Sequence, residues 1–529
     1  MAARGVTTAG IGVLTLAALV AGANVASGQA PLPAGPWTTV DEAEVLPAKA
    51  GANFWFGRHA DLDGDTLAVS GGLFQQGAVF IFVRDASGWH EQAEIRPAGE
   101  PLTGACSLDG DRIVVGAYTE ATNGTEAGAA YVYRRAGAVW SLEQTLRASD
   151  GAAMDHFGSA VDLAGDVLIV GAPQHSAPYG GKAYVFRNDG SACTEEAILA
   201  ATATSHDDFG DDVAIEGDLA VVGAYDLQSC SIYHCAAGAW TREVELFGDT
   251  AGEGFAQTVG LSGDTVVVGA PFRDGLRGGI YVYVRQGGLW PRQALLTTFS
   301  GVLGEALGAQ AAVDGDLVVG TSGLQEGRPQ TGSQKVFRRT GTQWEELGRL
   351  VSRTPRSGSR FGSDVTVDAG RVASGAYYAD VTGFRSGAAY VFPMFPGAAA
   401  NYGENSPDSA GVGARMAIAG TASLGGGTTL WALGAPAARS GLFFCGVKPA
   451  NLPFGNGKLL VSPFSPGLKR LPPLVVTDDF GTAFQELDPA RLPPGTAPGS
   501  TVFFQLWFRD FAGGAGFNLT DGLAVTFEP

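Results

Sequence analysis

A seven-fold repeat constrains this chain more than any other feature of its sequence. A short turn containing Gly-Asp, or a degenerate form of it, recurs at intervals of 46 to 55 residues. The copies are Asp63-Gly64-Asp65, Asp109-Gly110-Asp111, Ala164-Gly165-Asp166, Glu216-Gly217-Asp218, Ser262-Gly263-Asp264, Asp314-Gly315-Asp316 and Asp368-Ala369-Gly370. Self-similarity at such a period indicates a repeat architecture, in which each copy is one supersecondary unit.

Two further motifs accompany each turn. An aromatic-glycine pair, or a weakened form of it, lies before the turn: Phe56-Gly57, Thr103-Gly104, Phe157-Gly158, Phe209-Gly210, Phe255-Ala256, Leu307-Gly308 and Phe361-Gly362. After the turn, an apolar strand ends in a kink of small residues: Gly71-Gly72, Gly116-Ala117-Tyr118, Gly171-Ala172-Pro173, Gly223-Ala224-Tyr225, Gly269-Ala270-Pro271, Gly320-Thr321 and Gly375-Ala376-Tyr377. The order of the three motifs is the same in every unit.

Each unit predicts four strands. In the third unit, Ser159–Leu163 has period-two alternation, Val167–Val170 is apolar throughout, and Ala183–Phe186 forms a third strand. A fourth strand begins with Trp in most units, and four strands per unit are typical of a propeller blade. The 79 glycines and the low charged fraction of 16% also favour an all-β fold. We interpret the recurring Trp and Tyr residues as packing between blades.

These motifs resemble the FG-GAP repeat, which is similar to the blades of the integrin α-chain propeller. The resemblance covers Trp37 to Phe392 and implies a seven-bladed β-propeller with a role in binding or cell adhesion. Integrin-like relatives hold calcium in a long acidic loop between the first and second strands. Here that connection is only a tight turn, so we expect that calcium is not required.

The chain also predicts how the ring closes and where a second domain begins. The seventh unit runs from Phe392 straight into Pro393 and lacks a fourth strand. The segment Trp37–Leu46 has the layout of one, so we expect it to pair with the last blade and close a propeller over residues 37–396. Residues 397–529 contain strands without the repeat, which predicts a C-terminal β-sandwich domain.

Export is predicted from the first 28 residues. They contain Arg4, an apolar run from Ile11 to Val20, and small residues before Gln29, as in a signal peptide. We therefore expect a secreted, extracellular or cell-surface protein with no membrane span in the mature chain. A net charge of −19 argues against nucleic acid as a partner, and we expect a monomer that binds an extracellular protein or polysaccharide. The five cysteines are too few for a disulfide framework.

The sequence contains no zinc-helix motif, phosphate loop or nucleophile elbow, so we predict no catalytic residue and no enzyme activity. The pairs of His with Asp, as in Asp155-His156, do not supply a full ligand set, and we predict no metal and no cofactor. Two alternatives stay open. One is a structural matrix component, and the other is an extracellular hydrolase of polymers that would use Asp155, Asp207, Asp208, Asp211 and Glu253.

The predicted ligand-binding surface is the face formed by the loops between second and third strands, together with the segments that lead into the blades. These loops vary between units, and rigid scaffolds commonly present recognition residues on such loops. Aromatic and arginine side chains dominate binding energy at many interfaces. The candidates are Tyr118, Tyr179, Tyr225, Phe272, Arg273, Asp274, Tyr377 and Tyr378. For Tyr118, Tyr225 and Tyr377, packing over the blades is an equal alternative.

Overall fold

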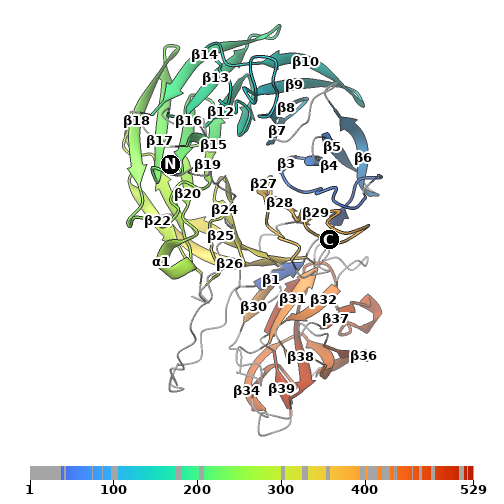
Figure 1. Cartoon of the computed structure of the whole chain (residues 1–529). Coiled ribbons are helices and arrows are strands. Elements are labelled where there is room, and N and C mark those ends of the chain that lie inside the picture. The colour runs from blue at the N-terminus through green and yellow to red at the C-terminus, as the bar shows by residue number, and fades with distance from the viewer. Residues whose placement is uncertain are drawn as a thin grey trace, which may run out of the picture.

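A computed structural model shows a ring of small antiparallel sheets with a second β-domain beside it (Figure 1). The structure describes residues 37–40, 43–49, 51–73, 76–85, 87–96, 105–173, 180–201, 208–298, 304–323, 332–352, 358–393, 399–402, 414–419, 429–433, 435–436, 438–454, 457–463, 468–477, 483–510, 517–520 and 522–527. The predicted signal peptide lies outside these residues.

Seven four-stranded units form the ring in the described part of the chain. The first three blades are β3 (Ala60–Asp63), β4 (Thr66–Leu73), β5 (Gln76–Asp85) and β6 (Gly88–Ile95); β7 (Cys106–Asp109), β8 (Arg112–Ala117), β9 (Ala129–Ala136) and β10 (Val139–Leu146); and β11 (Val161–Ala164), β12 (Val167–Ala172), β13 (Lys182–Asn188) and β14 (Cys193–Ala200). The fourth and fifth are β15 (Phe209–Glu216), β16 (Leu219–Ala224), β17 (Ser229–Ala236) and β18 (Ala239–Phe247); and β19 (Val259–Ser262), β20 (Thr265–Gly269), β21 (Ile280–Val284) and β22 (Arg292–Leu296). The sixth is β23 (Ala311–Asp314), β24 (Leu317–Ser322), β25 (Ser333–Thr340) and β26 (Gln343–Val351), and the seventh contains β27 (Val365–Asp368), β28 (Arg371–Gly375) and β29 (Ala389–Pro393).

The aromatic-glycine pair and the kink meet across the boundary between two blades. A Cβ added to Gly171, in the kink of blade three, would lie 2.0 Å from the carbonyl oxygen of Gly210, which leads into blade four. Gly116 and Gly375 stand in the same relation to Gly158 and Gly57. Glycine is required at these kinks because the two backbones approach too closely for any side chain.

Two kinks are displaced by one residue from the sequence motifs, one residue earlier in blade one and one residue later in blade six. The backbone N–H of Gly158 donates to the carbonyl oxygen of Gly171, and the corresponding acceptors for Gly57 and Gly308 are Ser70 and Thr321. Blades one and six therefore carry a hydroxyl residue where the other blades carry glycine. The expected kinks at Gly71-Gly72 and Gly320-Thr321 are corrected to begin at Ser70 and Thr321, because a sequence search for glycine cannot register a replaced glycine.

Tryptophans link the outer strands of neighbouring blades. Their indole N–H groups donate to side-chain oxygens on the preceding blade: Trp140 to Gln92, Trp240 to Glu196, Trp290 to Glu243 and Trp344 to Gln293, at 2.8–3.2 Å. This agrees with their interpretation as packing between blades.

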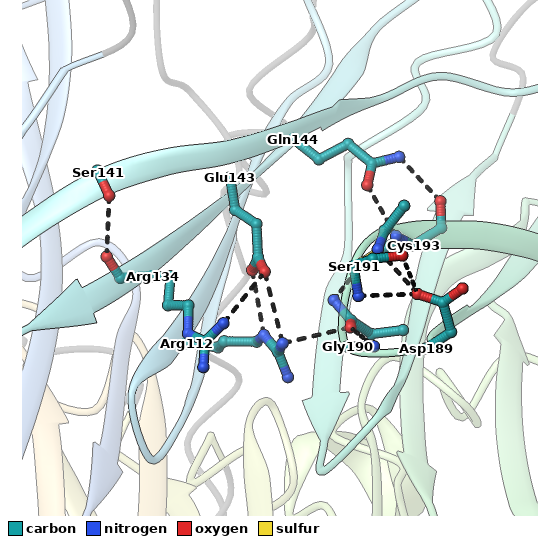
Figure 2. Close-up of polar contacts among 11 residues, drawn as sticks. Arg112, Arg134, Ser141, Glu143, Gln144, Asp189, Gly190, Ser191 and Cys193 are labelled. Atoms are coloured by element: carbon teal, nitrogen blue, oxygen red, sulfur yellow. Dashed lines mark hydrogen bonds and ion pairs between the residues drawn. The ribbon is translucent and has the colours of Figure 1, made fainter.

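Blade three has Cys193 in the place of the tryptophan, and a polar network replaces the indole bond (Figure 2). The side-chain amide of Gln144 bonds to both backbone groups of Cys193, at 2.7 and 2.8 Å. Beside it, the Arg112 guanidinium donates to Glu143 at 3.1 Å and to Asn188 at 3.2 Å (Figure 2). The contact between the second and third blades is thus kept by different chemistry.

Ring closure corrects part of the sequence prediction. Strand β2 (Ala43–Val45) pairs antiparallel with β29 and completes blade seven, and the Tyr390 hydroxyl donates to the Glu44 carboxylate at 3.0 Å. The first half of the expected closing strand, β1 (Trp37–Val40), does not join blade seven. It pairs in parallel with β26 of blade six and with β31 (Arg415–Ala419) of the second domain (Figure 1). Without β1, the edge strands β26 and β31 would each have unpaired backbone groups, and β1 forms hydrogen bonds with both strands.

The second domain packs two sheets around an apolar core that includes Met416, Leu430, Phe443 and Phe504. One sheet continues from β1 and β31 through β32 (Thr429–Leu433) and β37 (Ala483–Glu486). The other contains β30 (Ala399–Tyr402), β40 (Gly522–Thr526), β38 (Thr501–Arg509), β33 (Ser440–Gly446) and β36 (Lys469–Val476), with β39 (Phe517–Leu519) on β38. A hairpin joins β34 (Pro449–Phe454) to β35 (Gly457–Val461).

The predicted all-β fold class, a propeller followed by a β-sandwich, is confirmed. The short helical elements are α1 (Arg273–Leu276) and the 3₁₀ turn η1 (Pro489–Arg491), and Asp274 and Gly275 inside α1 have left-handed φ angles. No helix in the described ranges has the length and apolar character needed to cross a bilayer. All five cysteines fall within those ranges, and none forms a disulfide.

Candidate functional site

The loops between second and third strands are fixed to the next blade by backbone hydrogen bonds. In blade seven, the carbonyl oxygens of Phe384 and Arg385 accept from Asn53 and Trp55, which lead into blade one, at 2.7 and 3.1 Å. In blade five, the Leu276 carbonyl accepts from Ala306 at 2.9 Å. We call this side of the ring the loop face. Its described loops are held in place before any ligand binds.

The loop face presents some side chains from strained backbone. Arg360 and Arg385 have φ angles of 52° and 50°, in the left-handed region that non-glycine residues rarely adopt. Trp55, His156 and Ala306 take the same conformation immediately before their own blades. Because the strain recurs from blade to blade, it belongs to the repeat and fixes the direction in which each of these side chains leaves the backbone.

An aromatic and arginine cluster lies on the loop face of blade seven. We call Arg360, Tyr377, Tyr378, Phe384 and Arg385 the blade-seven cluster. The Tyr377 and Tyr378 rings are 4.3 Å apart, and the Arg360 and Arg385 guanidiniums lie 4.8 and 4.6 Å from the centre of the Tyr378 ring. The Arg360 guanidinium also donates to the Tyr377 hydroxyl at 2.7 Å, and Phe384 is 59% exposed. Two tyrosines that the sequence nominated are therefore gathered with three residues that it did not.

The second nominated group lies on blade five, and its three residues differ in availability. Phe272 is 39% exposed beside the exposed Leu276. Arg273 is turned inward, 3.8 Å from the buried Glu253 carboxylate and 3.9 Å from Asp249. Asp274 is exposed and forms an ion pair with Arg277 at 2.9 Å. Among these three residues, only Phe272 could contact a ligand without losing a charged partner.

The remaining nominated tyrosines lie on other blades. Tyr118 is half-buried, with its ring 5.7 Å from that of His156, and the His156 side chain bonds to Glu126 at 3.1 Å. Tyr225 is half-buried too, and burial is the main cause that raises the pKa of its hydroxyl. Tyr179 lies outside the described residues. Among the nominated residues that are described, Tyr377 and Tyr378 thus lie together on blade seven, the consecutive residues 272–274 lie on blade five, and Tyr118 and Tyr225 lie on two further blades.

The sequence did not single out Arg360, Phe384 and Arg385, because each looks like part of a motif that the fold requires. Arg360 directly precedes the Phe361-Gly362 pair, and Arg385 lies just before the glycine that opens the third strand. A usable signal exists in the variation between repeats. Arginine stands before the aromatic-glycine pair in this blade, where other blades have Trp55, His156, Asp208 or Ala306.

Carboxylates also line the inner strands, and each latches two blades together. Asp61 on β3 accepts from the Leu108 backbone N–H at 2.7 Å, Asp162 from Ile215 at 2.7 Å, and Asp212 from Val259 at 2.7 Å. Burial raises the pKa of Asp61 and of Asp212 to about 7, with the neighbouring charges of Asp162 and Asp211 acting in the same direction. These acids are committed to backbone N–H groups of the following blade.

The acids that the hydrolase alternative would use are engaged in a similar way where they are described. Asp155 is buried and accepts from the Ala152 backbone N–H at 2.6 Å. Glu253 is buried and accepts from the Tyr281 hydroxyl at 3.0 and 3.2 Å. Asp208 directly precedes β15, Asp211 lies within it, and Asp207 lies outside the described residues.

The turns between first and second strands do not fit a calcium ion. In the turn after β3, the Asp63 carboxylate accepts from the Gly110 backbone N–H at 2.6 Å, and Asp65 lies 3.6 Å from Arg84 and 3.4 Å from Arg371. Calcium takes six to eight oxygen ligands. Two acids that already have partners cannot supply them. Throughout the described ranges, no group of three or more His, Cys, Asp or Glu residues could hold a metal ion.

Several solved structures resemble this chain at low sequence identity. A candidate 6-phosphogluconolactonase from Bacteroides uniformis is 11% identical, with a TM-score of 0.42, and the match covers 60% of this chain and 89% of that one. The WD40 domain of Toxoplasma gondii coronin is 9% identical, with a TM-score of 0.41 and coverage of 70% and 90%. A periplasmic gluconolactonase from Pseudomonas aeruginosa is 15% identical, with a TM-score of 0.39 and coverage of 56% and 86%. No curated protein matches the chain.

The family model described as the FG-GAP repeat matches residues 104–133, 140–186, 194–229, 240–283 and 344–392. The unmatched stretches include blade one and the first three strands of blade six. These are the two blades in which Ser70 and Thr321 replace the kink glycine. A propeller of such repeats is a binding architecture, because the loops of all its blades share one face. With the repeat motifs, their contacts and the family match in agreement, this chain is an FG-GAP repeat protein.

Proposed function

We propose that this protein is secreted or retained at the cell surface, and that it binds an extracellular protein or polysaccharide through its loop face without catalysing a reaction. The observation that carries the proposal is the blade-seven cluster. It combines the exposed Phe384 ring with two tyrosines and two arginines, the residue types that dominate binding energy at interfaces. The signal-peptide pattern of residues 1–28 supports export.

The fixed loops support a recognition role. A loop that is already held by hydrogen bonds loses little conformational freedom when a ligand binds, so more of the contact energy appears as affinity. The cluster lies between two such anchors. The Tyr378 backbone N–H donates to Ser359 at 3.2 Å, and the Phe384 carbonyl accepts from Asn53 at 2.7 Å.

The engagement of the described acids supports a non-catalytic role. A general acid or base must exchange a proton with the substrate, and a glycosidase needs two carboxylates facing one bond. Asp61, Asp162 and Asp212 instead accept hydrogen bonds from the backbone of the next blade.

Binding of the labelled mature chain, residues 29–529, to glycan arrays and to intact cells tests the proposal. Replacing Tyr378 and Phe384 with Ala should weaken binding by more than about 2 kcal/mol, as for interface anchors. A second variant, Phe272→Ala with Leu276→Ala, removes exposed apolar side chains of the same face on blade five. A loss there as well would mean that the ligand spans several blades.

The matched control replaces Val139 and Leu142 with Ala. These residues are 67% and 51% exposed on β10, the outer strand of blade two, so the control also removes two exposed apolar side chains but not from the loop face. It should bind like the unmodified protein. Binding that is lost only in this control would contradict the choice of surface, and release of new reducing ends from a bound polymer would favour the hydrolase alternative.

A further inference from the structure

The blade-seven cluster lies at the end of a basic segment in an acidic chain. The whole sequence has 34 Lys and Arg against 53 Asp and Glu, whereas residues 349–360 contain four arginines and no acid. Of these, Arg360 belongs to the cluster, and Arg353 and Arg356 lie outside the described ranges. Charges more than about 8 Å away are largely screened at physiological salt. A ligand at the cluster therefore experiences the local arginines more than the net charge of −19.

The two guanidiniums of the cluster are positioned but not neutralised. Each stacks on Tyr378, and in the described part of the chain neither lies within 4.0 Å of a carboxylate in an ion pair. The nearest acid in the loop, Asp380, accepts a hydrogen bond from the Arg385 backbone N–H at 2.5 Å. A stacked guanidinium still presents planar N–H donors at its edge, and these match the oxygens of a carboxylate or a sulfate.

In blade five, an arginine and a tyrosine make a similar contact, but there the contact stabilises the fold. There Arg292 lies 5.5 Å from the centre of the Tyr281 ring, and it donates to Asp249 at 2.7 and 2.8 Å. The arginine of blade five thus has an acidic partner beside the tyrosine ring. In blade seven, the described structure supplies the arginines and the aromatic rings without one.

We propose that the blade-seven cluster binds the anionic groups of an acidic extracellular polysaccharide, with Arg360 and Arg385 holding a carboxylate or sulfate and the exposed Phe384 ring packing against a sugar ring. This inference rests on the proposed binding function and names the ligand class.

The structure favours a polysaccharide over an extended acidic peptide. Recurring modes of peptide binding use an open strand edge, a groove for a helix, or an aromatic groove for a proline-rich segment. The cluster comes from the segment before β27 and from the loop between β28 and β29, so it offers no strand edge for a peptide to extend. The Phe384 ring is exposed on the surface, where a sugar ring can lie against it.

Affinity measurements with the mature chain test this inference, using polygalacturonate as the carboxylate probe, dextran sulfate as the sulfate probe and dextran as the neutral probe. We expect one or both anionic polymers to bind, with affinity falling as salt is raised, and dextran to bind at least about tenfold more weakly. Arg360→Ala and Arg385→Ala should each reduce binding by about tenfold or more, the range for hydrogen bonds to charged groups. Arg360→Lys with Arg385→Lys should restore only part of it, because lysine keeps the charge but lacks the planar fork.

The charge-matched control is Arg134→Ala with Arg338→Ala. Arg134 lies near the end of β9 and Arg338 near the end of β25, both away from the loop face, so the control removes two positive charges outside the cluster. Equal losses in the control and in the cluster variants would overturn the site. Thermal unfolding of each variant separates lost binding from lost folding, and the lysine variant serves if an alanine variant unfolds.

Two other results would overturn the ligand class while leaving the proposed function intact. One is equal binding of dextran and the anionic polymers, with loss in the Tyr378→Ala and Phe384→Ala variant. The other is binding of an acidic peptide such as polyglutamate in place of all three polysaccharides. Failure of the proposed function itself is distinct, because then no loop-face variant changes the binding of the protein to cells or glycans.

Discussion

The carboxylate of Asp63 accepts a hydrogen bond from the backbone N–H of Gly110 in the next blade, at 2.6 Å. Asp368 and Gly64 repeat the relation at 2.6 Å between blades seven and one. Replacing Asp63 with Ala should lower the free energy of unfolding by about 1–2 kcal/mol, because an amide loses a charged acceptor at a partly exposed turn. Asp65→Ala, in the same turn, should change it by less than about 1 kcal/mol, since that exposed ion pair contributes little. Chemical denaturation of both variants measures these free energies of unfolding. Equal effects of the two substitutions would contradict a stabilising role for the hydrogen bond between Asp63 and Gly110.

Blade three lacks this hydrogen bond to the next blade. Ala164 occupies the position of Asp63 and has no side-chain oxygen that could accept a hydrogen bond from the backbone N–H of Gly217. Ala164→Asp should therefore raise the free energy of unfolding by about 1 kcal/mol, the usual net contribution of a new hydrogen bond. Thermal unfolding measures the gain. Ala164→Leu is the control, because it enlarges the side chain without adding an acceptor, and a comparable gain from it would show that the carboxylate is not the cause.

Gly171 and Gly165 separate two reasons for glycine in the repeat. A Cβ at Gly171 would lie 2.0 Å from the Gly210 carbonyl oxygen, whereas Gly165 has a φ of 64° and no atom within 4 Å of its added Cβ. Gly171→Ala should cost about 3 kcal/mol or more, because two blades must move apart. Gly165→Ala should cost only about 1–2 kcal/mol for the left-handed backbone. Denaturation midpoints and soluble yield measure the difference, and similar costs would refute the close contact as the reason for the kink glycine.

Sequence periodicity was sufficient to predict the blades because equivalent positions are buried in every blade. The alternation on first strands, the apolar second strands and the turns each reflect a local requirement, so they survive in one sequence without a structure. The positions of Ser70 and Thr321 could not be read in this way. They accept the same hydrogen bond as Gly171, but a hydroxyl residue at a kink carries no signal until the register of the sheets is known.

The candidate binding surface was predicted less completely, for a related reason. Tyr377 and Tyr378 follow a recognisable kink, whereas Arg360 and Arg385 reach them only because the loop of blade seven folds back beside the segment before β27. Arg273 shows the opposite case. Its position after a kink suggested exposure, but Asp249 and Glu253 face it from the segment between β18 and β19, and no spacing in the sequence reveals these contacts.

The buried acids of the inner strands should make stability fall as pH rises from 5 to 8. The pKa of Asp61 and of Asp212 is raised to about 7 by burial, so the folded chain keeps protons that the unfolded chain releases above about pH 4. Stabilisation from these protons is fully present below pH 4 and is lost as pH passes 7. Urea unfolding at pH 5, 6, 7 and 8 should show the decline, and Asp61→Asn with Asp212→Asn should flatten it.

Asp189 provides the control for this pH dependence. Hydrogen bonds from Ser191 and from backbone N–H groups lower its pKa to about 2, so it is ionised throughout the range from pH 5 to 8. Asp189→Asn should leave the slope of stability against pH unchanged in that range. A stability of the unmodified protein that rises from pH 5 to 8 would contradict the assignment of raised pKa values to Asp61 and Asp212.

Stepwise truncation tests the two roles of the N-terminal strands. A chain that begins at residue 37 should unfold like the mature chain, because β1 and β2 are retained. A chain that begins at residue 47 loses both β1 and β2, leaves the edges of β26, β31 and β29 open and exposes the surface that buries Val45. It should lose about 2 kcal/mol or more and aggregate more readily. Unchanged thermal unfolding in that shorter chain would disprove closure by β2.

If the protein holds a partner outside the cell, as proposed above, the double pairing of β1 also has a mechanical meaning. Residues Trp37–Val40 join the propeller sheet at β26 to the sheet of the second domain at β31, in parallel on both sides. A pull along these strands loads all the hydrogen bonds of a ladder in shear, so they must break together, whereas a pull across the strands would open them one after another. This four-residue strand is therefore a force-bearing joint, and tension on a bound partner would reach the second domain through it.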